Sequence, residues 1–337
     1  MRRFNILITA GSRRVPLVHA FRSALKSVGA IGSVIVTDVN PLSPAVHVAD
    51  RSYRVPMADH PDYVDELLAI CEAEQVRLAI PTIDDELPIF AAAREAFRSM
   101  GVMAVCSPEA TATLCNDKYA TCVRLAEAGV AAAKSYLPAQ LTDNMPLPLF
   151  IKPRVGRGAV GAFPVRTPEE LDFFLHYVDS PIVQEYLSGP EFTIDVLCDL
   201  DGTPLSIVPR ERVVVRAGVI DRGRTVNDRR LIELARAACA AIRFVGPINI
   251  QCRMRNGEPA IFEINPRFSG GIPLTIQAGA DFPAMLVKLA MGRKVEPSIG
   301  EFRSDLWMTS FESSFFLDGE TLALSTLKGS VDAEEVA

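Results

Sequence analysis

The chain has 337 residues, of which 49% are hydrophobic and 23% are charged, and its formal net charge is -6. This composition is that of a globular protein with sizeable cores in two or three domains, and it argues against extensive disorder. The acidic balance argues against a protein whose main task is to grip nucleic acid, because that affinity depends on a basic surface.

Cysteine and histidine usage argues against two further kinds of site. The seven cysteines are scattered and lack a Cys-x-x-Cys pair, so free thiols in a reducing compartment fit better than disulfides or a zinc site. The four histidines lie too far apart for metal-ligand spacing. No segment approaches the roughly 20 apolar residues of a membrane span, and the apolar run after Met1 is too short for a signal peptide. We therefore expect a cytoplasmic protein without a membrane partner.

The first 108 residues alternate between strand and helix patterns. Strands are predicted at residues 4–9, 33–39, 78–81 and 102–106, and helices at 15–28, 62–74 and 86–100. This alternation is typical of a parallel sheet covered by helices on both faces. The turn after the first strand holds a single glycine, Gly11, whereas a dinucleotide fingerprint needs three. We therefore expect a Rossmann-like α/β domain at residues 1–108, with NAD binding as the weakest interpretation of it.

The remaining chain is predicted to form a second domain and a tail. Helices and a proline-spaced connection are expected at residues 109–148, and strand-rich sequence at 149–200 and 204–226. A helix at 229–244, a hairpin and a helix at 281–291 follow. This second domain spans residues 109–300, and the C-terminal tail spans 301–337.

The hairpin carries a polar stripe. Strand patterns at residues 247–251 and 260–267 flank a turn signal at 255–258, and side chains alternate between two faces along a strand. Five polar side chains therefore share one face: Asn249, Gln251, Glu263, Asn265 and Arg267. A small set of carboxylate and amide oxygens suits Mg²⁺. A structural edge hairpin with a polar outer face is the alternative.

A strand ending at Lys152 leads into a glycine loop at residues 156–161. The loop satisfies Gly-x-Gly-x-x-Gly through Gly156, Gly158 and Gly161, but Pro164 bars a following helix, so it is expected to join two strands. Glycines let backbone N–H groups approach phosphate oxygens, and Lys152 and Arg157 add positive charge. A glycine-rich hairpin without a ligand is the alternative.

Two further sets of cations are candidates for anion contacts. Lys118 follows a predicted N-cap at Asn116 or Asp117, where the helix dipole disfavours a cation by about 0.3 to 1 kcal/mol. A bound anion would offset that cost, and a solvated lysine is the alternative. Residues 210–230 are rich in arginine, and Arg210 and Arg212 share one strand face. With Arg267 they are candidates to grip a carboxylate or an acyl phosphate.

Taken in order, these motifs and the segment from Gln184 to Glu191 resemble the ATP-grasp superfamily, most closely the large subunit of carbamoyl phosphate synthetase. The resemblance implies an α/β and α+β fold, in which a Rossmann-like pre-ATP-grasp domain precedes a two-part ATP-grasp domain. Residues 149–187 would form its glycine-loop subdomain. The implied cofactors are ATP and Mg²⁺, with Mn²⁺ as a substitute.

The resemblance also implies roles for individual residues. The nucleotide phosphates would contact Lys118, Lys152, Gly156 and Gly158. Around the adenosine, the backbone of Tyr186 and Leu187 would read the purine edge, Gln184 or Glu185 would accept from the exocyclic amine, and Glu191 would bind the ribose. The metal ligands would be Gln251, Glu263 and Asn265, and the catalytic residues Arg267 and Arg210. For Tyr186, core packing stays an equal alternative.

The implied activity is that of an ATP-dependent, ADP-forming carboxylate–amine ligase acting on small molecules, with amino acids as the preferred substrates. The chain departs from carbamoyl phosphate synthetase because it holds one ATP-binding unit, no evident glutamine-hydrolysing domain, and Phe268-Ser269-Gly270-Gly271 after Arg267. Carboxyphosphate chemistry is the runner-up, and a non-catalytic ATP-binding protein is the rival of a different class. Whether the chain forms a homodimer stays open.

Overall fold

The computed structural model describes residues 3–142, 144–156, 158–216 and 218–319, and it divides the chain into two compact units. Unit 1 comprises Met1–Cys106, Asp281–Val295 and Phe311–Ala337, and unit 2 comprises Ser107–Ala280 and Glu296–Ser310. Residues 281–295 were expected in the second domain. They lie in unit 1 because α11 (Phe282–Ala290) packs on α1 (Val15–Ser27), and Arg293 Nη1 then donates to the carbonyl of Val28 at 3.2 Å.

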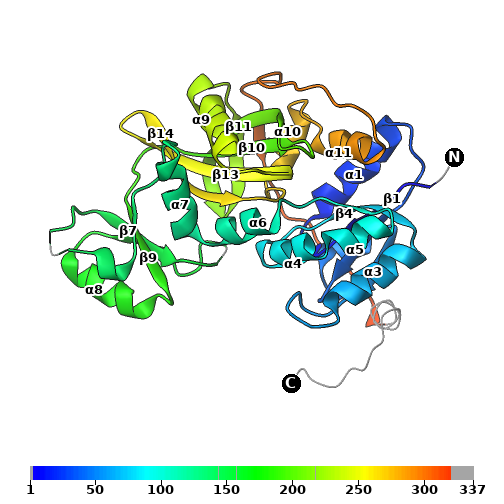
Figure 1. Ribbon diagram of the computed structural model, residues 1–337, viewed down its shortest axis with the longest axis horizontal. Coiled ribbons are helices and arrows are strands. Elements are labelled where there is room, and N and C mark those ends of the chain that lie inside the picture. Colours follow the sequence, from blue (N-terminus) through cyan, green and yellow to red (C-terminus); the bar gives the residue numbers. More distant parts are fainter. Residues whose placement is uncertain (1–2, 143, 157, 217, 320–337) are drawn as a thin grey trace. The chain divides into compact units, whose positions relative to one another are not determined.

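Unit 1 is built on a parallel sheet with the strand order β3-β2-β1-β4-β5 (Figure 1). Its strands are β1 (Asn5–Ile8), β2 (Val34–Asp38), β3 (Arg51–Arg54), β4 (Val76–Ile80) and β5 (Met103–Ala104). Its other helical elements are α2 (Pro44–Val48), α3 (Tyr63–Ala73), η1 (Asp84–Glu86), α4 (Leu87–Ala92) and α5 (Arg94–Ser99). The expected α/β domain with a parallel sheet is confirmed.

Two parts of unit 1 differ from the sequence prediction. The element β3 is an exposed edge strand without an apolar pattern, and the buried carboxylate of Glu74 holds it by accepting from Arg51 at 2.8 Å. The helix expected at residues 86–100 is divided into η1, α4 and α5. The buried carboxylate of Glu86 accepts from the backbone N–H of Thr82 at 2.6 Å and so fixes the turn that enters η1, whereas α4 and α5 are separated at Ala93.

Unit 2 contains an antiparallel sheet with the order β14-β13-β10-β11-β12-β15. Its strands are β10 (Glu191–Cys198), β11 (Pro204–Arg216), β12 (Val219–Thr225), β13 (Gly246–Arg255), β14 (Glu258–Asn265) and β15 (Trp307–Thr309). One face carries Ile194, Ile207, Ile250 and Ile264 and packs on α9 (Arg229–Ala241), as Figure 1 shows. The opposite face is polar, so the predicted division of the hairpin into a core face and a polar face is confirmed.

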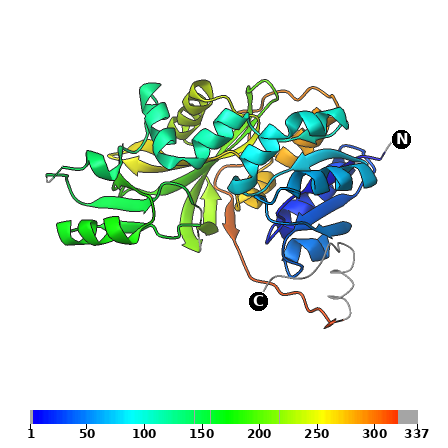
Figure 2. The same cartoon turned by 60° about the horizontal axis from the view of Figure 1, so that its bottom comes forward.

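A smaller antiparallel sheet with the order β6-β9-β7-β8 also lies in unit 2. It contains β6 (Ser135–Tyr136), β7 (Leu149–Pro153), β8 (Phe163–Val165) and β9 (Pro181–Glu185), and α8 (Pro168–Tyr177) packs against β7 and β8 (Figure 2). The strand-rich reading of residues 149–200 missed α8. Its signal was local: the Thr167 hydroxyl caps the helix by accepting from the N–H of Glu170, and Pro168 opens the first turn.

The remaining helical elements of unit 2 are α6 (Glu109–Asn116), α7 (Lys118–Glu127), η2 (Pro138–Gln140) and α10 (Ile272–Gln277). Asp117 caps α7, as one of the two predicted candidates, because its side chain accepts from the N–H of Ala120. Across the described part of the chain, every helix is too short or too polar to span a bilayer.

The two faces of β13 predict different outcomes for neighbouring truncations. Ile250→Ala should lower the free energy of unfolding by about 2 to 5 kcal/mol, because it opens a cavity in the core beneath α9. Gln251→Ala, on the polar face, should change it by about 1 kcal/mol or less. Urea denaturation of both variants measures the difference, and equal destabilisation would contradict this assignment of the two faces.

Candidate functional site

The polar face of the large sheet carries cross-strand rows of polar side chains. Residues directly opposite each other in an antiparallel pair point to the same face. The observed registers align three rows: Asn265, Asn249 and Asp195; Glu263, Gln251, Thr193 and Arg210; and Arg253 with Glu191. Arg212, two residues after Arg210, joins the third row through an ion pair with Glu191. The sheet thus gathers residues that are 74 positions or less apart in the chain into one surface.

The predicted metal ligands come together at the edge of this surface. Gln251 lies opposite Glu263, and Asn249 lies opposite Asn265. A bulge shifts the register of β14 at Phe262, so Glu263 and Asn265 both stay on the polar face. The amides of Asn249 and Asn265 are buried, and within the described residues Asn249 Oδ1 and Asn265 Nδ2 have no hydrogen-bond partner.

These donors fit a magnesium ion. Among the described residues, no group of three or more His, Cys, Asp or Glu side chains could hold a metal ion. Mg²⁺ is usually held by one or two carboxylates together with substrate phosphates. One carboxylate, Glu263, flanked by the amides of Gln251 and Asn265 and by the unpartnered Asn249 oxygen, matches that pattern.

Lys152 reaches from the small sheet to this edge. Its Nζ donates to the carbonyl of Phe262 at 3.2 Å and lies 5.1 Å from the centroid of the Phe262 ring. Burial lowers the pKa of Lys152, and the nearby carboxylate of Glu263 opposes that effect. A buried ammonium between the two sheets is therefore held beside the candidate metal ligands.

Lys118 also meets a backbone carbonyl instead of solvent. Its Nζ donates to the carbonyl of Gly156 at 2.5 Å, and the side chain is buried. The solvated-lysine alternative is thereby excluded. Asp117, the cap of the same helix, forms an ion pair with Arg154 at 2.5 Å, so the start of α7 and the glycine loop are connected at two points.

The glycine loop joins β7 to β8 as predicted. Gly156, Gly158 and Gly161 have φ angles of 148°, 70° and 69°, which side chains other than glycine rarely adopt. A side chain on Gly218, in the β11–β12 turn, would come within 3.0 Å of Gly158 Cα, so the two turns approach each other closely. The predicted contribution of Arg157 lies outside the described residues.

The end of β9 and the residues that follow it differ in their surroundings. The Gln184 side chain is buried and donates to Ser135 Oγ at 2.8 Å, while Glu185 accepts from Arg255 at 2.7 Å, so both are engaged within the protein. Leu187 is packed against Ala260 in a small core cluster.

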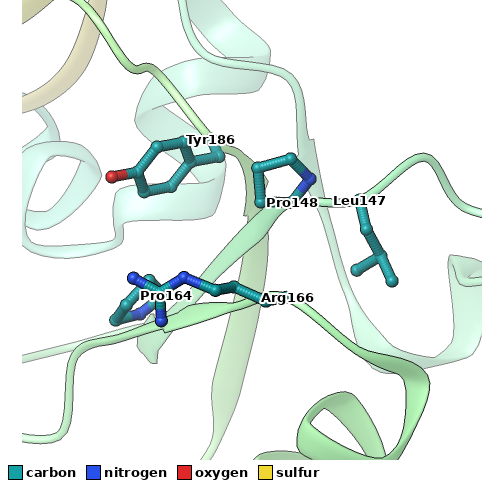
Figure 3. Close-up of a pocket in the computed structure, with 5 residues that line it drawn as sticks. All are labelled: Leu147, Pro148, Pro164, Arg166 and Tyr186. Atoms are coloured by element: carbon teal, nitrogen blue, oxygen red, sulfur yellow. The ribbon is translucent and has the colours of Figure 1, made fainter.

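Tyr186 differs from these neighbours because it is exposed to a pocket. The pocket has a volume of about 330 Å³ and is lined by Tyr186, Leu147, Pro148, Pro164 and Arg166. Figure 3 shows Tyr186 on one side of the pocket and Arg166, from the end of β8, on the other. Core packing, the alternative weighed for Tyr186, does not describe a side chain that is 38% exposed.

Glu191 is enclosed by two arginines. Its carboxylate is 2.8 Å from Arg212 Nε and 2.5 Å from Arg253 Nη2. Burial lowers the pKa of Arg212, and Glu191 opposes that effect. Sequence reasoning missed Arg253, although it lies two residues after Gln251 and period-2 alternation puts it on the same face.

Arg210 lies deeper than its predicted role requires. Its side chain is 1% exposed, and its Nε and Nη2 atoms donate to Asp195 at 2.7 and 3.1 Å. The prediction that Arg210 grips a substrate carboxylate does not fit this burial. Arg267 is half-buried in the turn after β14 and donates to the carbonyl of Phe268 at 3.1 Å.

The surface as a whole favours an anionic ligand. Lys118, Lys152, Arg212 and Arg253 supply four positive charges, and Glu191 and Glu263 supply two negative ones. These charges interact electrostatically, since Lys118, Glu191 and Glu263 all influence the pKa of Lys152. A surplus of positive charge in a partly buried setting suits a polyphosphate, and the metal ligands lie beside it.

An antiparallel sheet with this polar face, opposed by a smaller sheet with a glycine loop, defines the ATP-grasp class of protein. Residues 178–313 match the family model described as ATP-grasp in the biosynthetic pathway with Ter operon, and residues 6–105 match the model for the PylC-like N-terminal domain. The chain therefore carries an ATP-grasp domain preceded by a PylC-like N-terminal domain, and the predicted family resemblance is confirmed.

One similar curated protein is the carbamoyl phosphate synthase arginine-specific large chain of Bacillus subtilis (strain 168). It is 26% identical over 262 residues, a match that covers 71% of this chain and 25% of the relative. The chain thus spans about a quarter of the length of that relative.

Solved structures share the fold at low identity. The biotin carboxylase domain of Hydrogenobacter thermophilus 2-oxoglutarate carboxylase, in complex with MgADP, ADP and bicarbonate, has a TM-score of 0.71 at 16% identity, covering 91% of this chain and 74% of that one. The L-amino acid ligase of Bacillus licheniformis has a TM-score of 0.67 at 16% identity, covering 90% and 78%. The predicted fold class is confirmed.

Replacing Lys152 should weaken ATP binding without lowering the stability of the fold. In Lys152→Met the buried ammonium is lost, so the free energy of unfolding at pH 7 should stay unchanged or rise, as for other buried ions replaced by apolar groups. Affinity for ATP should fall about tenfold or more, the cost of a lost charge-assisted hydrogen bond. Calorimetric titration with ATP and thermal unfolding measure the two effects.

The pH dependence gives a second check on Lys152. Because burial lowers its pKa in the folded state, the folded protein binds fewer protons there than the unfolded chain, so this group makes stability rise with pH between its lowered pKa and its ordinary value. Lys152→Met should lose that rise, while Lys26→Met, on an exposed side chain of α1, should retain it. Identical pH profiles for the two variants would contradict the burial of Lys152.

Proposed function

We propose that the chain is an ATP- and Mg²⁺-dependent ligase that activates a carboxylate as an acyl phosphate and joins it to an amine. The observation that carries this proposal is the meeting of Glu263, Gln251 and Asn265 on one sheet with the buried Lys152 of the other. One carboxylate and two amides beside a buried ammonium suit a metal-bound polyphosphate.

The nucleotide would lie along the polar face. Its phosphate oxygens would accept from the ammonium groups of Lys118 and Lys152 in place of the backbone carbonyls of Gly156 and Phe262. The N–H groups of the glycine loop would also donate to the phosphates. The pocket beside Tyr186 is large enough for adenine. Gln251, Glu263 and Asn265 would hold Mg²⁺, with Mn²⁺ as a substitute, and the bound ion would neutralise phosphate charge.

In the proposed reaction a substrate carboxylate oxygen attacks the γ-phosphorus and ADP leaves. The amine nitrogen then attacks the acyl carbon, phosphate leaves, and the nitrogen loses a proton. Phosphoryl transfer asks little covalent chemistry of the protein, so its residues position the reactants and neutralise charge. Arg267, in the turn directly after the metal strand, is proposed to stabilise the transferring group.

Amino acids are the proposed substrates. The shared fold of an L-amino acid ligase favours this class. Carboxyphosphate chemistry is the second candidate, favoured by the match to a carbamoyl phosphate synthase large chain and by a structural neighbour that binds bicarbonate. Bicarbonate therefore belongs in any substrate screen.

Glu263→Gln should abolish substrate-dependent ADP release, because it removes the charge of the single carboxylate among the proposed metal ligands. The free energy of unfolding should change by about 1 kcal/mol or less, since the side chain is only partly buried. Phosphate release measured over a panel of amino acid pairs, and over bicarbonate with amines, gives the activity. The matched control is Glu258→Gln, at the exposed start of the same strand.

The same screen separates the rival classes. A ligase releases ADP only with a particular acid and amine, whereas a non-catalytic ATP-binding protein binds ATP and releases no ADP with any pair. Full turnover in Glu263→Gln would contradict the proposed metal site.

A further inference from the structure

A buried ion pair lies beneath the polar face of unit 2. Asp195 of β10 accepts from Arg210 of β11 at 2.7 and 3.1 Å, and both side chains are 1% exposed. Thr275, on α10, also donates to Asp195, at 2.5 Å. Buried ion pairs are weak contributors to stability, because desolvation offsets much of their attraction. A role beyond stability is therefore a reasonable hypothesis for this one.

The network reaches the proposed metal site from two directions. Arg210 Nη2 donates to Ser269 Oγ at 2.9 Å, and Ser269 lies in the turn that follows β14, two residues after Arg267. On the sheet side, Asp195 lies opposite Asn249, which in turn lies opposite Asn265. The Ser269 end of the segment from Asn265 to Ser269 is thereby bonded to the ion pair, and its Asn265 end lies in the same cross-strand row as Asp195.

Two glycines make room for this arrangement. A side chain on Gly271 would lie 2.4 Å from Arg210 Nη1 and 2.4 Å from Ile220, and one on Gly270 would lie 2.8 Å from Val219. These contacts are too close for any Cβ atom. In this segment, where the chain departs from the carbamoyl phosphate synthetase pattern, Gly271 therefore lies against Arg210, and Gly270 lies against Val219.

We propose that Asp195, Arg210 and Thr275 are positioning residues that fix the Asn265–Ser269 turn, so that Asn265 is presented to the metal and Arg267 to the transferring phosphoryl group. This inference rests on the proposed function. Outer partners of metal ligands fix ligand orientation, and their loss weakens metal affinity or activity about 10- to 100-fold. The buried position of Arg210 assigns it to this role instead of direct contact with a substrate.

Two mild substitutions test the proposal without breaking the ion pair. Thr275→Val keeps the side-chain shape and removes one bond to Asp195, and Ser269→Ala removes the bond from Arg210. Thr275→Ser restores a hydroxyl and is the rescue variant. Thr111→Val is the matched control, because Thr111 is a buried threonine of α6 that donates to the carbonyl of Arg243, outside the polar face.

The readout is the binding of Mn²⁺, followed by electron paramagnetic resonance in the presence of a non-hydrolysable ATP analogue. We expect Thr275→Val and Ser269→Ala to weaken Mn²⁺ binding about 10-fold or more. Thr275→Ser and Thr111→Val should stay within about twofold of the wild type, and the analogue without metal should bind all variants equally. Arg210→Lys keeps the positive charge but loses the planar guanidinium that makes two parallel bonds to Asp195, so it should weaken Mn²⁺ binding as much as Thr275→Val does.

Each outcome decides one question. If Thr275→Val and Ser269→Ala lower the melting temperature but bind Mn²⁺ as the control does, the network is only structural and the inference is overturned. If they raise the KM of the acid that the substrate panel identifies without changing Mn²⁺ binding, the network acts on the substrate site and not on the metal site, and the inference is also overturned. Wild-type protein that binds no Mn²⁺ with the analogue overturns the proposed function itself.

Discussion

The register of β13 against β14 is the constraint on which the site depends. Side chains alternate with period two, so a slip of one residue would turn Glu263 and Asn265 into the core and bring Ile264 to the polar face. The apolar partners of Ile264 and Ile250 on α9 oppose such a slip. The bulge at Phe262 absorbs the extra residue and leaves its carbonyl for Lys152. The hydrophobic core thus determines where the proposed metal ligands lie.

Backbone carbonyls hold the two buried lysines of this site. Lys118 and Lys152 are buried, and each donates to a backbone carbonyl, Gly156 or Phe262. A neutral carbonyl satisfies the donor geometry but does not neutralise the charge, so both ammonium groups keep a desolvation cost. A phosphate oxygen would satisfy both requirements. The difference between the two partners is a source of binding free energy that is already present in the fold.

Most of the correct predictions came from local sequence patterns. The period-2 pattern identified the polar stripe of the hairpin, and the residue types at its positions indicated a metal and phosphates. The helix α8 was missed although Thr167 and Pro168 carry an N-terminal capping signal, and its three aromatic residues, Phe173, Phe174 and Tyr177, are of a type that is also common in strands. The partners of Glu191 and Arg210 were not predictable, because pairing depends on which strands become neighbours. Asp195 precedes Arg210 by 15 residues, and only the observed register makes them a pair.

Arg210 shows that the strand face on which a residue lies does not by itself establish the role of that residue. Alternation correctly put Arg210 and Arg212 on the same face, but their depths and partners differ. Arg212 pairs with Glu191 and donates to the carbonyl of Gly218, in the turn that approaches the glycine loop. Arg210 points beneath Gly271 and meets Asp195. Because this arginine is enclosed and bonded to Asp195 and Ser269, we assign it to holding the turn that carries Arg267 and not to contact with a substrate.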